Sequence, residues 1–274
     1  MAWWYKNKKQ LKIGRSWKDD TGRHIQSSWI DWTDERKAAN YIIWDFITNE
    51  NLFGAPARVT VNAAAASSAN LQTLFNKTQP RSWTENIEKI YNVPNDITMG
   101  ALTIPENMNG SLIINIDGTV IGVSGSAGAS NSGAGGVGGA AISIASTSVT
   151  VNVFGNLLAG GGGGGGGGNG GNTIGIHGGG AGGVGGRGQG YGLDAVNGSD
   201  GAIGEANAGT GGSGGNGATY GAAGLPGKIG ASGNITKGNN GGMAGAAGRA
   251  IIFKEISTYE IIKISSGTIS GAYS

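Results

Sequence analysis

The chain has 274 residues, enough for one large domain or two smaller ones. Only 13% of the residues are charged and the net charge is +2, which argues against a nucleic-acid-binding protein with a dominant basic surface. The sequence contains no cysteine, so disulfides and thiolate metal sites are excluded. Residues 1–10 lack the apolar stretch of a secretory signal, and no segment has the long apolar run of a membrane span.

The composition changes sharply along the chain. All seven tryptophans lie at or before Trp83, whereas 51 of the 58 glycines lie between Gly118 and Gly248. This contrast predicts two domains, an attachment domain rich in Trp and Lys at 1–96 and a glycine-rich domain at 97–274.

Within the first domain, the residues 1–32 are expected to form short strands or extended segments. Three helices are predicted further on. The first begins after a Thr33 N-cap and ends near residues 51–56, the second spans 62–76, and the third runs from a capping box at Ser82 to Tyr91. Beyond residue 97 the helical signals stop, and the blocks 111–123, 142–154 and 250–264 have the residue types of β-strands.

The glycines between these blocks recur with a period of three, as at 221, 224, 227, 230 and 233. Three residues per turn is the repeat of a polyproline-II-type helix, which makes no internal hydrogen bonds and must bond to neighbours. Collagen shares this period but needs long unbroken triplets and much proline, whereas this region breaks phase repeatedly. The pattern therefore predicts a compact bundle of polyglycine-II helices. The expected fold is a small α+β N-terminal domain followed by this bundle, with a few β-strands at its base.

The nine consecutive glycines, Gly160 to Gly168, have no side chain at any phase. Such a tract can contact neighbours on all sides, so we expect it to be the innermost segment of the bundle. The phase breaks divide the region into eight passes, at roughly 118–127, 134–141, 158–171, 178–188, 198–204, 210–216, 221–233 and 240–249.

The order of these segments resembles the tail-fibre tip adhesins of T-even-type bacteriophages. The strand-like SLIINIDGTVIG leads into GSAGASNSGAGGVGG, and TSVTVNVFGNLLAGG leads into the nine-glycine tract. The short insertion NTIGIH and a further GGGAGGVGG follow. The resemblance covers about the last 160 residues. It implies a sandwich of polyglycine-II helices whose free-end loops bind an outer-membrane protein or a surface glycan of the host. The Trp-rich N-terminal third does not match that family's attachment domain.

If successive passes alternate in direction, the turns near 128–133, 172–177, 205–209 and 234–239 form the tip. The turns near 142–157, 189–197 and 217–220 form the base, together with the strands. The predicted receptor-binding residues are Ser130, Asn131, Asn172, Thr173, Ile174, Ile176, His177, Glu205, Asn207, Asn234, Ile235 and Lys237. Their isoleucines are either receptor contacts or packing that closes the turns. A miscount by one turn would place a different set at the tip, namely Tyr191, Leu193, Asp194 and Tyr220.

Other chemistry finds little support. A GxGxxG match at Gly180 is uninformative in so glycine-rich a stretch and lacks a βαβ unit. The two histidines, His24 and His177, have no evident partners for a metal site or a catalytic triad. Asp194, Asp200 and Glu205 could form a glycosidase pair in a glycan depolymerase, but scattered turn carboxylates usually serve as polar caps. We therefore expect no catalytic residue, metal or cofactor. A structural or ice-binding glycine-rich protein is the alternative.

The N-terminal domain is expected to mount the protein on a phage tail or fibre protein. Trp3, Trp4, Trp17, Trp29 and Trp32 are the predicted contacts, because tryptophan is enriched at interface hot spots. The expected location is the virion tail, with extracellular action at the host surface. The sequence does not fix the number of chains, and a homotrimer is one alternative.

Overall fold

Within residues 1–57, the computed structural model describes only the strands. Beyond them, it describes residues 58–174, 177–254, 259–263 and 267–273. The chain divides into two compact units, Met1–Arg58 and Val59–Ser274. The division expected at 96/97 falls within the second unit. No helix in the described ranges has the length and apolar character needed to cross a membrane.

The first unit contains an antiparallel sheet of three strands. They are β1 (Trp4–Lys6), β2 (Gln10–Ile13) and β3 (Trp29–Asp31), with β2 in the middle. The short strands expected in residues 1–32 are therefore confirmed at these positions. The helix expected after Thr33 lies outside the described residues.

The second unit begins with three β-sheets, and every pairing from β5 to β17 is parallel. The first sheet contains β4 (Arg58–Asn62), β6 (Ile87–Val93), β9 (Gly110–Ile116), β12 (Val149–Val153) and β15 (Tyr259–Lys263). The second contains β7 (Thr98–Met99), β10 (Thr119–Ile121), β13 (Asn156–Leu158) and β16 (Thr268–Ser270). The third contains β5 (Ser68–Asn70), β8 (Ala101–Ile104), β11 (Ile142–Ile144), β14 (Arg249–Phe253) and β17 (Ala272–Tyr273).

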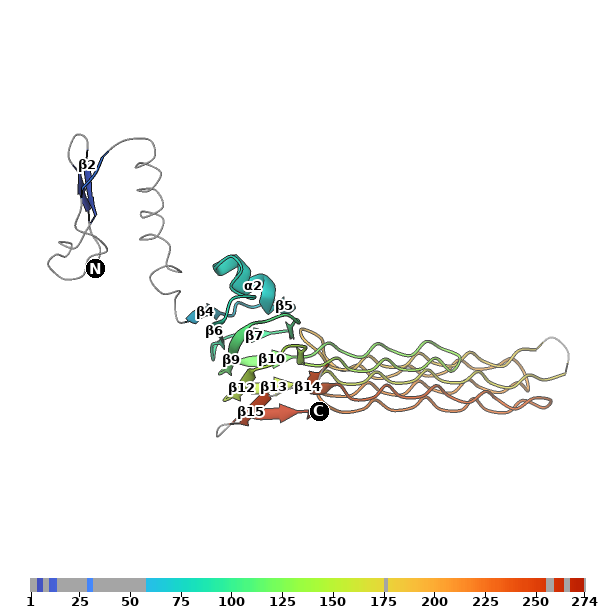
Figure 1. Cartoon of the computed structure of the whole chain (residues 1–274). Coiled ribbons are helices and arrows are strands. Elements are labelled where there is room, and N and C mark those ends of the chain that lie inside the picture. Colours follow the sequence, from blue (N-terminus) through green and yellow to red (C-terminus); the bar gives the residue numbers. More distant parts are fainter. Residues whose placement is uncertain are drawn as a thin grey trace. The chain divides into compact units, whose positions relative to one another are not determined.

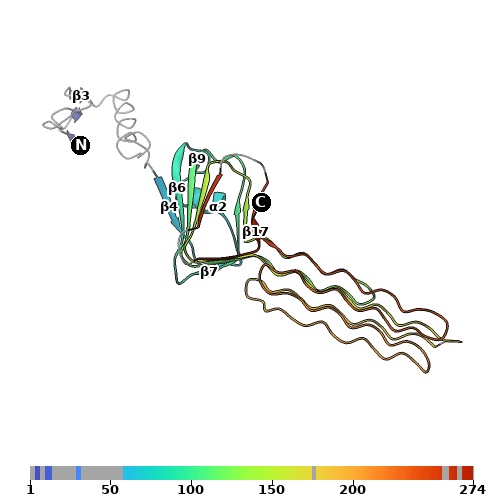
Figure 2. The same cartoon turned by 90° about the horizontal axis from the view of Figure 1, so that it is seen from below.

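The chain visits these sheets in a fixed rotation. It runs β6–β7–β8, then β9–β10–β11, then β12–β13–β14, and finally β15–β16–β17, each coil stacking on the one before (Figures 1 and 2). The result is a three-sided parallel β-solenoid, in which each coil contacts chiefly its neighbours. The strand-like blocks 111–123, 142–154 and 250–264 lie in this solenoid, as their residue types predict.

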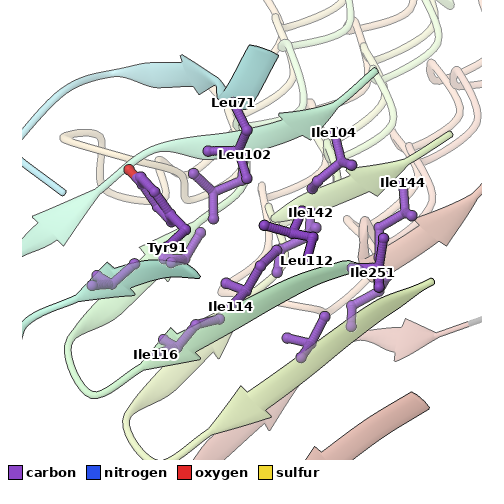
Figure 3. Close-up of a cluster of buried hydrophobic side chains, with 14 of the residues drawn as sticks. Leu71, Tyr91, Leu102, Ile104, Leu112, Ile114, Ile116, Ile142, Ile144 and Ile251 are labelled. Atoms are coloured by element: carbon purple, nitrogen blue, oxygen red, sulfur yellow. The ribbon is translucent and has the colours of Figure 1, made fainter. Parts of the chain in front are cut away.

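The solenoid core forms because alternate strand residues point inward. In β9, Leu112, Ile114 and Ile116 are fully buried, while the two residues between them are only partly buried. Figure 3 shows these side chains packed between the sheets with Leu102, Ile142 and others. Each fully buried side chain of this size contributes about 1.5–3 kcal/mol of transfer free energy, so the core dominates the stability of this part.

Two predicted helices are wrong or shortened. The second half of the expected helix at Ser82–Tyr91 is part of strand β6, because Lys89, Tyr91 and Val93 alternate inward and pair in parallel with β9. Long-range pairing here overrides a local capping signal. The helix expected at 62–76 is only α2 (Leu71–Thr78), which begins at an Asn70 N-cap that accepts from Thr73 N. Residues 68–70 form β5 instead, since they pair with β8.

Two polar features reinforce the solenoid. An asparagine ladder crosses the first sheet, with Nδ2 of Asn92, Asn115 and Asn152 each donating to the Oδ1 of the asparagine in the preceding strand, beginning at Asn62. The buried Lys89 donates to the carbonyls of Glu85, Ile87 and Asn109. Burial lowers the pKa of Lys89, and nearby Glu85 partly opposes that shift.

Tyr91 should make the solenoid sensitive to alkali. Its buried hydroxyl contacts Met99 Sδ, and burial raises its pKa to about 12. Above pH 10 the unfolded chain loses this proton first, so the free energy of unfolding should fall between pH 10 and 12, by about 1.4 kcal/mol at pH 11. The Tyr91→Phe variant should lack this loss. Denaturant midpoints of both proteins at pH 9 and pH 11 test the expectation, and an equal alkaline loss in both would contradict it.

The glycine-rich residues are insertions that leave the solenoid and return to it at one corner, between the second sheet and the third. In two coils this corner is a single glycine, Gly100 after β7 and Gly271 after β16. In the two coils between them, the same corner carries residues 122–141 and 159–248. Figures 1 and 2 show these insertions running away from the sheets as long, gently undulating segments that lie side by side.

Eight such segments form the array, as the eight expected passes predict. They span 122–128, 133–140, 159–171, 178–189, 196–204, 209–218, 222–233 and 238–248. Their backbone hydrogen bonds run between segments, and none of the eight is a strand or helix.

Residues 159–171, here called the central segment, hold the array together. The N–H groups of Gly160, Gly161 and Gly162 donate to Gly139, Gln189 and Ala222 in three different neighbours, and the rotation repeats every three residues. The carbonyl groups accept from three further segments, through donors such as Gly125, Gly215 and Gly245. The central segment thus has six bonded neighbours, and only 196–204 lies outside this ring. Gly160 to Gly168 are all buried, so the innermost position expected for this tract is confirmed.

Candidate functional site

Three turns meet at the end of the array that is farthest from the sheets. Their described residues are 172–174 with 177, 205–208 and 234–237, and they follow the ends of neighbouring segments (Figure 1). Gly171 O accepts from Gly209 N, and Gly171 N donates to Ala231 O, which fixes these segments at one level. We call this end the tip. Chain segments that are distant in sequence thus form one small surface.

Hydrogen bonds join the first and third of these turns. Asn172 N donates to Thr236 Oγ1 over 2.7 Å, and Asn172 O accepts from the N–H groups of Ile235 and Thr236. Thr173 is buried beneath the surface, which gives it a packing role. The first turn is therefore fixed to the third through Asn172.

A hydrogen bond between two side chains joins the first and second turns. His177 Nδ1 lies 2.8 Å from Glu205 Oε2, and the same carboxylate oxygen accepts from Gly178 N at 3.2 Å. Both side chains are about half exposed, so solvent screens the pair and its contribution is at most about 1 kcal/mol. Its main effect is to fix the spacing of the two turns.

The turn at 129–132 ends closer to the sheets than the other three. Ser132 N donates to Gly167 O, so four residues of the central segment, Gly168 to Gly171, continue beyond it. Asn131 and Ser132 have left-handed φ values of 60° and 69°. Asn239 Nδ2 donates to Asn131 Oδ1 at 3.1 Å, which connects this turn to segment 238–248.

The structure thus brings most of the predicted site residues to one end of the array. Ser130 and Asn131 lie on the lower turn, and Asn172, Ile174, His177, Glu205, Asn207, Asn234, Ile235 and Lys237 are exposed on the other three. Ile174 is 75% exposed and Ile235 is 58% exposed, so neither isoleucine is used to close its turn. Ile176 lies outside the described residues.

The alternative set of residues lies at the opposite end. Tyr191 N donates to Gly122 O, and Gly190 pairs with Leu193, which places this turn beside the first residue after β10. Gly221, next to Tyr220, donates to Ala159 O directly after β13. Burial raises the pKa of Tyr220, and the nearby charge of Asp194 raises it further. These residues therefore adjoin the solenoid.

Two of the carboxylates considered for catalysis lie at opposite ends of the array. Asp194 lies at the solenoid end, whereas Glu205 lies at the tip, so they cannot act as a pair. His24 lies outside the described residues. No cluster of three or more metal-ligating side chains is found in the part of the chain that the structure describes. Gly180, where the GxGxxG match begins, donates to Gly209 O within the array, so this glycine serves the contact between two segments.

Several tip residues were not predicted from the sequence. Thr236 bonds to Asn172, while Asn169 Oδ1 accepts from Gly182 N and Asn172 Oδ1 accepts from Gly179 N. Asn240 O accepts from Ser132 Oγ. A signal was present, because asparagines stand where the glycine tracts end, and an amide side chain can replace a backbone partner.

A family model described as the phage tail fibre adhesin Gp38 matches residues 56–274. The chain belongs to this family. The resemblance suggested by the order of strands and glycine tracts is thereby confirmed, and the protein is a phage tail-fibre adhesin located in the virion tail. The match begins close to the boundary between the two compact units, so the adhesin's residues 1–55 lie outside it.

Comparison with solved structures gives a weaker likeness. The gp37-gp38 adhesin tip complex of the bacteriophage S16 long tail fiber shares 21% identity, covering 86% of the adhesin and 92% of that chain, with a TM-score of 0.38. That score is too low to carry an argument. A comparison with curated protein sequences finds no match.

Proposed function

We propose that the adhesin recognises its host through the tip of the array, using the exposed residues of the turns 172–177, 205–208 and 234–237 with the lower turn at 129–132. One observation carries this proposal: three turns from distant parts of the chain meet at the end of the array that is farthest from the solenoid, and a fourth turn ends a short distance below them. The tip exposes Ile174 and Ile235 among polar side chains, and exposed apolar groups with a polar rim are typical of protein interaction sites. The ligand is a host outer-membrane protein or a surface glycan.

The eight segments of the array are polyglycine-II helices in this proposal. Three observations support the assignment: the bonding pattern repeats every three residues, the bonds run between segments, and the central segment has six neighbours. Such helices make a rigid stalk, because every N–H and C=O group from Gly160 to Gly168 is bonded to a neighbouring segment or turn. The tip is thereby held away from the solenoid without a side-chain core.

The attachment domain expected at residues 1–96 supplies the contact with the fibre. Residues 1–96 include the tryptophans expected to contact a tail or fibre protein, and Trp4 and Trp29 lie in the strands β1 and β3. Trp3, Trp17 and Trp32 lie outside the described residues. The adhesin acts outside the cell at the host surface, as a binding protein without catalysis. Whether its copies form a homotrimer depends on the fibre.

The tip proposal is tested with paired charge substitutions. Ile174→Asp combined with Ile235→Asp places two carboxylates in the expected contact surface. Losing a hot-spot contact of about 2 kcal/mol should weaken binding to susceptible cells about 30-fold. The control combines Val137→Asp with Val184→Asp, on two exposed positions along the sides of the array. Labelled protein and cell-binding isotherms measure both. The proposal is contradicted if the two double variants bind equally well while both remain folded.

A further inference from the structure

The array is incomplete at one side of the tip, where the turn at 129–132 ends early. Below this turn, the segments 122–128 and 133–140 occupy two of the six positions around the central segment. Above it, Gly168 to Gly171 continue without them, over about 12 Å at 3.1 Å per residue. We call this feature the step. Its floor is the turn at 129–132, and its wall is the end of the central segment.

The step leaves backbone groups of the central segment without their usual partners. Every third N–H group of the central segment donates to segment 133–140, namely those of Gly160, Gly163 and Gly166. The residue three positions further on is Asn169. In the same way, every third carbonyl accepts from segment 122–128 or from the turn, namely those of Gly161, Gly164 and Gly167. The carbonyl three residues further on is that of Gly170. Among the described residues, neither Asn169 N nor Gly170 O has a hydrogen-bond partner, although both residues are only partly exposed.

Asparagine side chains surround these groups. Asn169 Oδ1 and Asn172 Oδ1 accept from Gly182 N and Gly179 N, the donors that would otherwise face an extension of segment 122–128. Asn131 and Asn239 bond to each other at the floor, beside the exposed Asn240. A carboxamide offers both a donor and an acceptor, as a peptide unit does. The step is thus lined by groups that match a peptide backbone.

We propose that the step binds an extended segment of a host surface protein, about four residues long, which takes the position that a longer segment 133–140 would occupy. The segment supplies a carbonyl to Asn169 N–H, as strand addition does at a sheet edge, while Gly170 C=O faces the neighbouring open position, that of segment 122–128. This inference rests on the proposed function, because it specifies a ligand for the tip. A peptide is favoured over a glycan because the surrounding positions of this array are all filled by extended backbone.

Blocking the step tests the inference. Asn131→Trp places a large side chain on the floor, and Ser130→Trp does so from a neighbouring position without a left-handed φ. Asn107→Trp is the matched control, since Asn107 is an exposed asparagine with the same φ of 60° in a solenoid turn. Binding to outer-membrane fragments from a strain that the wild-type protein labels should weaken at least about tenfold for the two step variants and less than twofold for the control.

The outcomes separate this inference from the tip proposal. If the double isoleucine variant loses binding while neither step variant does, the step inference is wrong and the tip proposal stands. If none of these variants loses binding, both are wrong. Wild-type binding should disappear after the fragments are treated with protease and persist after periodate oxidation of their glycans. Persistence after protease with loss after periodate would overturn the peptide assignment. Should Asn131→Trp misfold, Ser130→Trp and slowed amide exchange at 168–171 on binding decide the question.

Discussion

Substituting one glycine in the central segment should unfold the array. A Cβ at Gly164 would overlap the carbonyl group of Gly215 in a neighbouring segment, so Gly164→Val must push that segment away and break its hydrogen bonds. We expect a loss of about 4 kcal/mol or more, because the clash is with backbone and cannot be relieved by a rotamer change. Amide exchange should show lost protection at 160–168.

Val184→Ala is the matched substitution, because Val184 is exposed on a ring segment. Removing its side chain should change the free energy of unfolding by less than about 0.5 kcal/mol. Denaturant unfolding of both variants measures the difference. Equal tolerance of the two substitutions would mean that the nine glycines act as a flexible linker and not as the centre of the array.

Removing the whole array should abolish host binding while leaving the solenoid folded. The natural corner at Ser270–Ala272 shows that a single glycine can join the second sheet to the third. Replacing 159–248 with one glycine, and deleting 123–141 after Gly122, would give every coil such a single-glycine corner. The solenoid core lies between its own sheets, so these deletions remove little of it.

The expected result is cooperative unfolding with a β-type circular dichroism spectrum, together with at least about a 100-fold loss of cell binding, which equals about 2.7 kcal/mol. Unaltered binding by the folded deletion variant would place the receptor site outside the array. A chain that no longer folds would show that the array is part of the folding unit.

The array could be predicted from the sequence because its rule is local. The glycines from Gly221 to Gly233 recur every three residues, and the tract Gly160 to Gly168 has no side chain at any position. The two ends followed from counting passes, and the structure places Asn172 and Tyr191 at opposite ends as that count requires.

The solenoid was not predicted, although the strands β9 to β12, β14 and β15 lie in blocks that were expected to form strands. Strand β13 and strand β14 belong to one coil but are separated by 90 residues, so the coil repeat is hidden in the sequence. A trace of it remains in Gly118–Thr119 and Gly267–Thr268, which occupy corresponding corners of two coils. The helix expected at Ser82–Tyr91 failed for the same reason, since a capping signal is local and the pairing of β6 with β9 is not. The step at the tip depends on relative segment lengths, which composition does not reveal.

The uniformity of Gly160 to Gly168 has a consequence for folding. If this tract slid along its axis by three residues, each glycine would meet the same set of neighbours, and most of the tract's hydrogen bonds could form again. The tract itself therefore cannot specify its own alignment. That information must come from its two ends, where β13 pairs with β10 and Asn169 bonds to Gly182. Assembly that begins at the solenoid would set this alignment before the glycines pack. Assembly that begins among the glycines would allow several alignments of nearly equal free energy.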